Sequence, residues 1–169
     1  MHPLKKIVAT RVLALLLVAT ALWQQQQTAA KADAAPSDSP WQAPLAAPLH
    51  LINPYFQPNS DYSAGHRGVD YRVTLDDEIY APTDATVWFV GKVVDRPVVS
   101  LRTKSGDLLE FEPACSALGP GDQVTAGQTI ARVCKADSGY RQHCQGQLCL
   151  HFSLRTDRGY LSPMVRYGS

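Results

Sequence analysis

The stretch QLCLHFSLR, residues 147–155, alternates apolar side chains with polar or small ones. Strict alternation is typical of a β-strand, in which successive side chains point to opposite faces. Cys149 and His151 therefore lie on one face of the predicted strand, at a spacing that suits a shared metal ion. The stretch is either part of a metal site or a strand whose disulfide cysteine lies beside a histidine.

Further segments with the same β-type composition follow His50, separated by Gly, Pro and Asp. The sequence KSGD at 104–107 predicts a hairpin turn. After the N-terminal region, no segment keeps a 3.6-residue apolar period over three turns. Many short strands joined by turns predict an all-β domain, an antiparallel β-sandwich or barrel. The predicted strands are 68–73, 78–80, 86–94, 97–103, 108–112, 129–134 and 148–155.

The N-terminal region has a different composition. Lys5, Lys6 and Arg11 precede an apolar run at residues 12–23, which polar and then small residues follow. This order predicts a secretory signal peptide over residues 1–34. An uncleaved N-terminal anchor is the alternative, although the run is short for a bilayer-spanning helix, which needs about 20 residues.

The remaining chain has the composition of an ordinary globular protein. Of the 169 residues, 45% are hydrophobic and 18% are charged, and the formal net charge is +1. We expect a flexible linker at residues 35–49, because it is rich in Ala, Pro and Ser, and one domain at residues 50–169. The near-neutral charge gives no electrostatic basis for binding nucleic acid. We expect a secreted, extracytoplasmic monomer.

All four cysteines lie in the C-terminal third of the chain. An even number of cysteines in an exported chain favours disulfides. Three pairings are possible. The short separation favours Cys144–Cys149, which leaves Cys115–Cys134. The sequence contains no C-x-x-C pair, which argues against a structural zinc knuckle.

The sequence GHRGVDY, residues 65–71, contains a second candidate for metal binding. His66 and Asp70 are separated by three residues, and imidazole and carboxylate groups both bind zinc. Together with His151 they make a set of two histidines and one aspartate, the composition of an open zinc site with three protein ligands. Taken singly, each has a simpler explanation: a turn histidine, a surface aspartate and a half-buried strand histidine.

Four motifs occur together in this sequence: GHRGVDY (65–71), DDEIYAPTDATVWFVG (76–91), GPGDQVTAGQTIARV (119–133) and LHFSLR (150–155). In this order and spacing they closely resemble the lysostaphin-type (LytM-like) zinc metallopeptidases, over roughly residues 54–163. The resemblance implies an antiparallel β-fold that uses one zinc ion to cleave cross-bridge or stem peptides of bacterial peptidoglycan. It also implies His66 and Asp70, from the family's H-x-G-x-D, and His151, from its H-x-H, as the zinc ligands.

The sequence departs from the family at the two histidines that assist catalysis. The first histidine of H-x-H is Cys149 here, and the histidine of Y-x-H is Pro113. Neither a proline side chain nor a disulfide-bonded cysteine can accept a proton. Two nearby residues are candidate catalytic replacements: His143, which a Cys144–Cys149 bridge would draw toward the zinc strand, and Glu112, which precedes Pro113.

Cys149 has two possible roles. Its thiolate would add a fourth zinc ligand and close the site, but a cysteine five residues upstream in an exported chain favours a disulfide instead.

The leading hypothesis is a secreted zinc metalloendopeptidase that acts on peptidoglycan peptides. The lost histidines also motivate an alternative, a catalytically degenerate relative that binds cell wall or activates another murein hydrolase.

Two further features of the sequence bear on the fold and the site. GPGDQVTAGQTIARV alone is similar to biotin- and lipoyl-type carrier domains, but the sequence has no lysine-centred hairpin for such a group. Several aromatic residues near the predicted site loops either line a substrate groove or pack within the domain. These are Tyr55, Phe56, Tyr62 and Tyr140.

Overall fold

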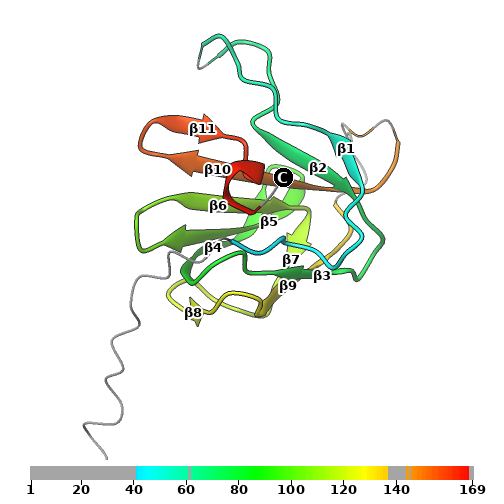
Figure 1. The fold of residues 1–169 in the computed structure, drawn as a ribbon. Helices are drawn as coiled ribbons and strands as arrows, with labels where there is room; N and C mark the ends of the chain where they lie inside the picture. The colour runs from blue at the N-terminus through cyan, green and yellow to red at the C-terminus, as the bar shows by residue number, and fades with distance from the viewer. Residues whose placement is uncertain (1–40, 61, 137–143, 145, 168–169) are drawn as a thin grey trace, which may run out of the picture. The chain divides into compact units, whose positions relative to one another are not determined.

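The computed structural model describes residues 41–60, 62–136, 144 and 146–167. Within these residues the regular structure is β-sheet, apart from the short helix α2 (Met164–Tyr167) (Figure 1). No helix in the described part of the chain is long and apolar enough to span a membrane. The predicted signal peptide, His143 and Tyr140 lie outside the described residues, and the predicted domain boundaries stay predictions.

The larger sheet has eight strands in the order β1-β2-β10-β6-β5-β4-β8, with β11 beside β10. All of its pairings are antiparallel. Its strands are β1 (Leu51–Asn53), β2 (Gly68–Arg72), β4 (Ala85–Val93), β5 (Arg96–Thr103), β6 (Leu108–Glu112), β8 (Gln123–Val124), β10 (Cys149–Thr156) and β11 (Gly159–Leu161).

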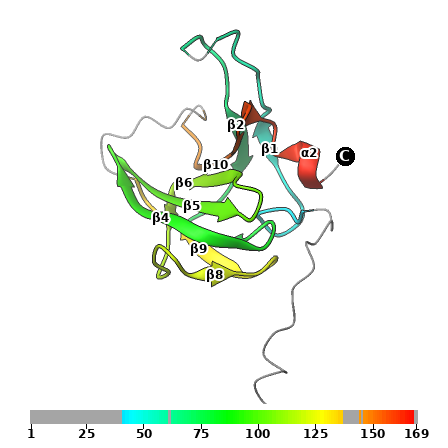
Figure 2. The same ribbon diagram turned by 90° about the vertical axis from the view of Figure 1, so that its left-hand side faces the viewer.

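A smaller antiparallel sheet packs against the larger one. It has three strands in the order β3 (Glu78–Tyr80), β9 (Thr129–Val133) and β7 (Ala114–Cys115), and Figures 1 and 2 show it on one side of the larger sheet. Both sheets contribute buried apolar side chains to one hydrophobic core, which includes Val69, Ile79, Leu101, Phe111, Ile130, Val133 and Phe152. The predicted all-β, antiparallel sandwich is confirmed.

The side chains of strand β10 alternate between the core face and the outer face of the larger sheet. Leu150, Phe152 and Leu154 are completely buried in the core, and the Phe152 ring stacks on Phe111 with ring centroids 4.8 Å apart. The alternate residues of β10, among them His151, point to the opposite face. The alternation in residues 147–155 therefore predicts the strand correctly and fixes which side of it is available for chemistry.

Each segment predicted as a strand contains a strand in the structure, and the observed ends differ from the predicted ends by at most one residue. The KSGD hairpin is confirmed: it joins β5 to β6, Gly106 has a positive φ of 92°, and the Thr103 amide donates to the Asp107 carbonyl at 2.9 Å. The structure adds β1, β7, β8 and β11, each of two or three residues. Such short strands carry too few side chains for alternation to be visible in the sequence.

Residues 41–45, within the predicted linker, pack against the domain. Trp41 and Leu45 pack on the hydrophobic core. The Gln42 amide donates to the Pro82 carbonyl at 2.8 Å, and the Tyr80 amide donates to the Pro44 carbonyl at 2.8 Å. The segment at 41–45 is thus ordered by backbone hydrogen bonds, which composition alone does not predict.

The structure contains two disulfides. Cys115 is bonded to Cys134, which connects β7 to the residue that follows β9, and Cys144 is bonded to Cys149 at the start of β10. Cys144 is completely buried and Cys149 nearly so. All four cysteines are therefore disulfide-bonded.

Candidate metal centre

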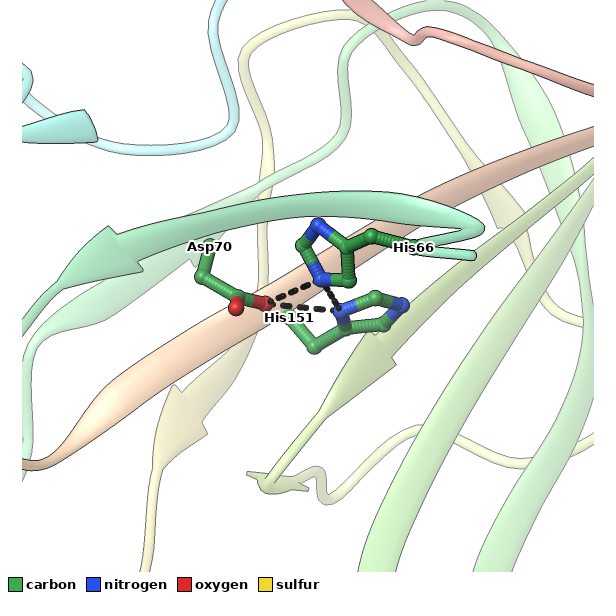
Figure 3. Close-up of side chains that lie close together, drawn as sticks. All are labelled: His66, Asp70 and His151. Atoms are coloured by element: carbon green, nitrogen blue, oxygen red, sulfur yellow. Dashed lines mark hydrogen bonds and ion pairs between the residues drawn. The ribbon is translucent and has the colours of Figure 1, made fainter. Parts of the chain in front are cut away.

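His66, Asp70 and His151 converge on the outer face of the larger sheet (Figure 3). His66 Nε2 lies 3.2 Å from His151 Nδ1. Asp70 Oδ1 lies 2.7 Å from His151 Nδ1 and 3.2 Å from His66 Nε2. The structure thus brings together the three residues predicted as zinc ligands, although they are separated by up to 85 positions in the chain.

Backbone pairing explains how these side chains meet. Asp70 in β2 lies directly opposite His151 in β10, and cross-strand partners point to the same face of a sheet. His66 precedes β2 and is held by a backbone bridge to Phe56, with hydrogen bonds in both directions. Asp70 is completely buried, whereas the His66 and His151 side chains are 22% and 13% exposed. One side of the cluster is therefore open to solvent.

Asn53 and Pro54 orient two of the three side chains. The Asn53 side-chain amide donates to Asp70 Oδ2 at 2.8 Å, and His66 Nδ1 donates to the Pro54 carbonyl at 2.8 Å. The first bond leaves Oδ1 of Asp70 directed at the histidines. The second places the His66 proton on Nδ1, so that Nε2 presents its lone pair to the cluster. Such outer hydrogen bonds fix the tautomer and orientation of metal ligands.

Gly68 makes room for the His151 ring. It lies on β2 opposite Ser153, next to the pair formed by Asp70 and His151. A Cβ atom at this position would lie 2.5 Å from the Phe152 carbonyl oxygen and 2.6 Å from both Cε1 and Nε2 of His151. Because atoms do not approach so closely, a side chain at residue 68 would displace the imidazole.

The three residues fit a zinc ion. Zinc binds imidazole nitrogen and carboxylate oxygen at about 2.0–2.2 Å, and atoms separated by 2.7 and 3.2 Å can all reach one ion at that distance. The donor set also has the composition of an open zinc site. The hydrogen bond to Asp70 raises the pKa of His66, so a proton and a zinc ion would compete for Nε2, and zinc binding would release that proton.

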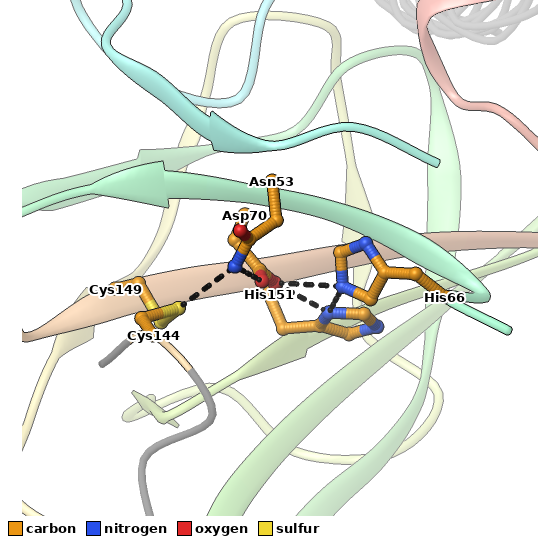
Figure 4. Close-up of a disulfide and its surroundings, with 6 residues drawn as sticks. All are labelled: Asn53, His66, Asp70, Cys144, Cys149 and His151. Atoms are coloured by element: carbon orange, nitrogen blue, oxygen red, sulfur yellow. Dashed lines mark hydrogen bonds and ion pairs between the residues drawn. A yellow bond between two sulfur atoms is a disulfide. The ribbon is translucent and has the colours of Figure 1, made fainter. Parts of the chain in front are cut away.

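Cys149 is not a candidate fourth ligand in this structure. The sulfur atoms of Cys144 and Cys149 lie near Asp70, but they are bonded to each other, and a disulfide has no thiolate to offer a metal. The disulfide instead adjoins the outer hydrogen bonds, because the Asn53 amide that donates to Asp70 also lies 3.8 Å from Cys144 Sγ (Figure 4).

Glu112 lies on the same sheet face as the three candidate ligands. Its register partner across β6 and β10 is His151, so Asp70, His151 and Glu112 form a row across three adjacent strands. Glu112 is nearly buried and accepts a 2.7 Å hydrogen bond from Arg96 Nε. Glu110, two residues earlier in β6, lies on the same face. Burial and the nearby charge of Glu112 raise the pKa of Glu110. Pro113 follows Glu112 and precedes β7.

Two residues that hydrogen-bond to the candidate site residues are not predicted from the sequence. Asn53 is the last residue of the short strand β1 and faces Asp70 only because β1 pairs with β2. Arg96 begins β5 and reaches Glu112 across 16 positions. Neither residue belongs to a motif with a characteristic spacing, so no local signal in the sequence marks them.

Comparison with known proteins identifies the family. Residues 64–163 match the family model of peptidase family M23. This chain belongs to peptidase family M23. It is also 33% identical over 109 residues to uncharacterized proteins of Mycobacterium bovis and Mycobacterium tuberculosis. The aligned region is 64% of this chain and only 42% of each relative.

Solved structures share the fold at lower sequence identity. A chain of the SpoIIQ–SpoIIIAH pore-forming complex aligns with a TM-score of 0.61 at 17% identity, over 76% of this chain and 91% of its own. A zinc-containing peptidase from Vibrio cholerae gives 0.59 at 17% identity, over 72% and 38%. The catalytic domain of lysostaphin from Staphylococcus simulans gives 0.55 at 18% identity, over 69% and 90%. The resemblance to the lysostaphin-type family is confirmed.

Proposed function

We propose that this protein binds one zinc ion through His66, Asp70 and His151 and hydrolyses peptide bonds of bacterial peptidoglycan outside the cytoplasm. The observation that carries the proposal is the convergence of the three ligand atoms on the solvent-facing side of the sheet. The bonds from Asn53 and to Pro54 hold two of them in orientations suited to a metal. Membership of peptidase family M23 supports the same chemistry.

The protein supplies the ligands and the groups that surround them. A zinc ion bound here would act as a Lewis acid, polarising a peptide carbonyl and activating water. Glu112 is proposed to take the part of a missing helper histidine, because its carboxylate can accept a proton and lies on the site face in register with His151. Arg96 would position that carboxylate through its 2.7 Å hydrogen bond. His143 is retained as a second candidate helper.

Disulfides support a location outside the cytoplasm. Both bridges lie in the domain itself, and disulfides persist mainly in oxidising compartments. Together with the predicted signal peptide, they favour export to the cell envelope, where peptidoglycan would be the substrate and another cell-wall hydrolase a possible partner. We propose that the protein acts there as a monomer.

A second candidate function is a catalytically degenerate protein that binds cell wall or activates another hydrolase. The observation that favours it is the loss of both helper histidines: Cys149 is in a buried disulfide, and Pro113 has no group that transfers protons. Such a protein would keep the fold and the binding surface without cleaving peptide bonds.

Digestion of purified peptidoglycan by the zinc-loaded protein distinguishes the two functions. The peptidase should release new amino termini, and Glu112→Gln should reduce this rate by at least about a hundredfold, as expected for a proton acceptor. Glu78→Gln is the control, since it makes the same change of side chain on β3, in the smaller sheet. Retained binding to peptidoglycan without any cleavage would support the degenerate protein instead.

A further inference from the structure

The outer face of the larger sheet carries a second row of side chains beside the metal centre. Ser153 in β10 lies opposite Glu110 in β6, and Glu110 lies opposite Ser100 in β5. Ser100 in turn lies opposite Phe89 in β4. Cross-strand partners share a sheet face, and Ser153 is two residues from His151 on the same strand. The row therefore crosses four adjacent strands on the face that holds the candidate ligands (Figure 2).

The two serines of this row are buried but not hydrogen-bonded. Ser100 is 6% exposed and Ser153 is 5% exposed. Neither hydroxyl has a hydrogen-bond partner within the described part of the chain. Of the fully enclosed side-chain nitrogen and oxygen atoms there, only Arg102 Nε lacks a partner, so both serine hydroxyls still reach solvent. A polar group in this situation needs a ligand or a water molecule to complete its hydrogen bonds.

Glu110 supplies a hydrogen-bond acceptor between the two serines. It is exposed to solvent, although partial burial of its carboxyl group raises its pKa, as does the charge of Glu112. Three positive or ionisable groups oppose these effects: His151, Arg96 and Arg155. Because charges of both signs act on this carboxyl group, the row does not select a ligand by its net charge. A neutral molecule with hydroxyl or amide donors suits a carboxylate, which accepts hydrogen bonds.

Phe89 ends the row with an exposed aromatic ring. The residue is 37% exposed, and its ring extends over Gly91, where an added Cβ would lie 2.8 Å from Phe89 Cζ. The missing side chain at residue 91 thus lets the ring lie along the sheet. The neighbouring Trp88 already carries the Arg102 guanidinium, whose carbon lies 3.6 Å from the centroid of the Trp88 ring. Phe89 is therefore the aromatic surface that this row offers to a ligand.

The chemistry of the row matches a sugar. A pyranose ring has hydroxyl groups that can donate to the Glu110 carboxylate and exchange hydrogen bonds with the Ser100 hydroxyl. Its C–H groups also form an apolar face, which packs against the electron-rich face of an aromatic ring. A peptide main chain provides donors and acceptors but no such apolar face. The combination of a carboxylate, a hydroxyl and an aromatic ring thus favours a neutral saccharide.

Distances across the sheet relate this row to the metal centre. Adjacent strands lie about 4.8 Å apart, so Phe89 in β4 is about 14 Å across the sheet from β10, and two residues along a strand add about 7 Å. An extended peptide advances about 3.3–3.6 Å per residue. A sugar on Phe89 would therefore be joined to a scissile bond at the metal centre by about four or five residues, with Ser153 beneath the connecting peptide.

We propose that Phe89, Ser100 and Glu110 form a saccharide-binding subsite, which holds a sugar of the glycan strand while the attached stem peptide extends to the metal centre. The subsite deepens the proposed function and depends on it for the identity of the substrate. It predicts that this protein prefers stem peptides that are still attached to sugar over free peptides.

Binding of two matched ligands tests the subsite separately from catalysis. The probes are a dye-labelled muropeptide, in which a disaccharide carries the stem peptide, and the same labelled peptide with an acetyl group in place of the disaccharide. Fluorescence anisotropy of each probe with the full-length zinc-loaded protein is read immediately after mixing, before cleavage. The muropeptide should bind about tenfold more tightly, because it adds a stacking contact and a charge-assisted hydrogen bond.

Three substitutions in the row should change this preference. Phe89→Ala and Glu110→Gln should each remove most of it while the affinity for the acetylated peptide stays the same, which also shows that the variants are folded. Phe89→Leu should keep only part of it, because leucine is apolar but has no flat ring. The controls are Leu75→Ala, an exposed apolar residue between β2 and β3, and Glu78→Gln in the smaller sheet. Both should keep the full preference.

Several results would overturn the subsite. One is equal binding of the two probes by the unmodified protein, and another is an equal loss of preference in Phe89→Ala and Leu75→Ala. An equal fall in affinity for both probes in Phe89→Ala would assign the row to the peptide instead of the sugar. Cleavage of peptidoglycan without a preference for the muropeptide would overturn the subsite and leave the peptidase intact. Preferential binding of the muropeptide without cleavage would support the subsite and count against the peptidase.

Discussion

Asn53 and Asp70 face each other across the pairing of β1 with β2, and the Asn53 amide donates a 2.8 Å hydrogen bond to Asp70 Oδ2. Asp70 is completely buried, so this bond satisfies a carboxylate oxygen that would otherwise lose its hydration without compensation. A strand of only three residues therefore determines how the candidate ligand Asp70 is oriented.

Replacement of Asn53 should weaken zinc binding without removing a ligand. For Asn53→Ala we expect zinc affinity to fall by about 10–100-fold, the usual effect of losing a hydrogen bond to a metal ligand. Competition with a chromogenic chelator measures the change. Asn59→Ala, at an exposed position in the loop that follows β1, should leave the affinity unchanged; an equal loss there would show that the effect is not specific to Asp70.

Gly68→Ala should damage the centre by steric displacement. The new methyl group would overlap the His151 ring and the Phe152 carbonyl, so we expect a loss of about 1–3 kcal/mol in the free energy of unfolding and weaker zinc binding. Urea unfolding and zinc titration measure the two effects. Gly119→Ala is the control, since its Cβ would meet nothing nearer than 4.0 Å. Normal zinc affinity in Gly68→Ala would contradict the close packing described.

The two disulfides should differ in their contribution to stability. Cys115 and Cys134 are separated by 19 positions and Cys144 and Cys149 by 5. Longer loops lose more entropy on closure, so the paired serine variants should lose about 3 and about 2 kcal/mol of unfolding free energy, respectively. Guanidinium unfolding of both double variants tests the order, and a larger loss for the shorter loop would contradict it.

A histidine at residue 149 should increase cleavage if the missing helper limits the peptidase. Residue 149 shares a sheet face with His151. We expect Cys144→Ser/Cys149→His to cleave peptidoglycan at least about tenfold faster than Cys144→Ser/Cys149→Ser, since a placed proton acceptor contributes about 10²–10⁴-fold. Equal rates in two variants of equal stability would show that this position does not limit turnover.

The sequence predicts those parts of the structure that depend on local pattern. Alternation in residues 147–155 predicts the strand and the face on which His151 lies, and the KSGD turn predicts the hairpin between β5 and β6. The metal candidates are found because histidine and aspartate at these spacings resemble a family whose motifs are short and contiguous. The convergence of His66 and His151 is a consequence of β2 pairing with β10, which no local pattern specifies.

What the sequence does not predict depends on contacts between distant segments. The roles of Asn53 and Arg96 arise from strand register, and the contact of Arg67 and Arg155 with Tyr160 requires the short strand β11 to fold back on β10. Arginine and asparagine are common surface residues. Their chemistry becomes visible only when the fold brings them to the same face.

The most direct test of the central claim is the zinc content of the purified protein after equilibration with zinc and exhaustive dialysis, with folding checked by circular dichroism. The protein should retain about one zinc ion per chain, and His66→Ala, Asp70→Ala and His151→Ala should each retain almost none. His50→Ala, which removes an exposed histidine away from the cluster, should retain the full amount. No zinc in the unmodified protein, or full zinc in a folded His151→Ala variant, would contradict a metal centre at His66, Asp70 and His151.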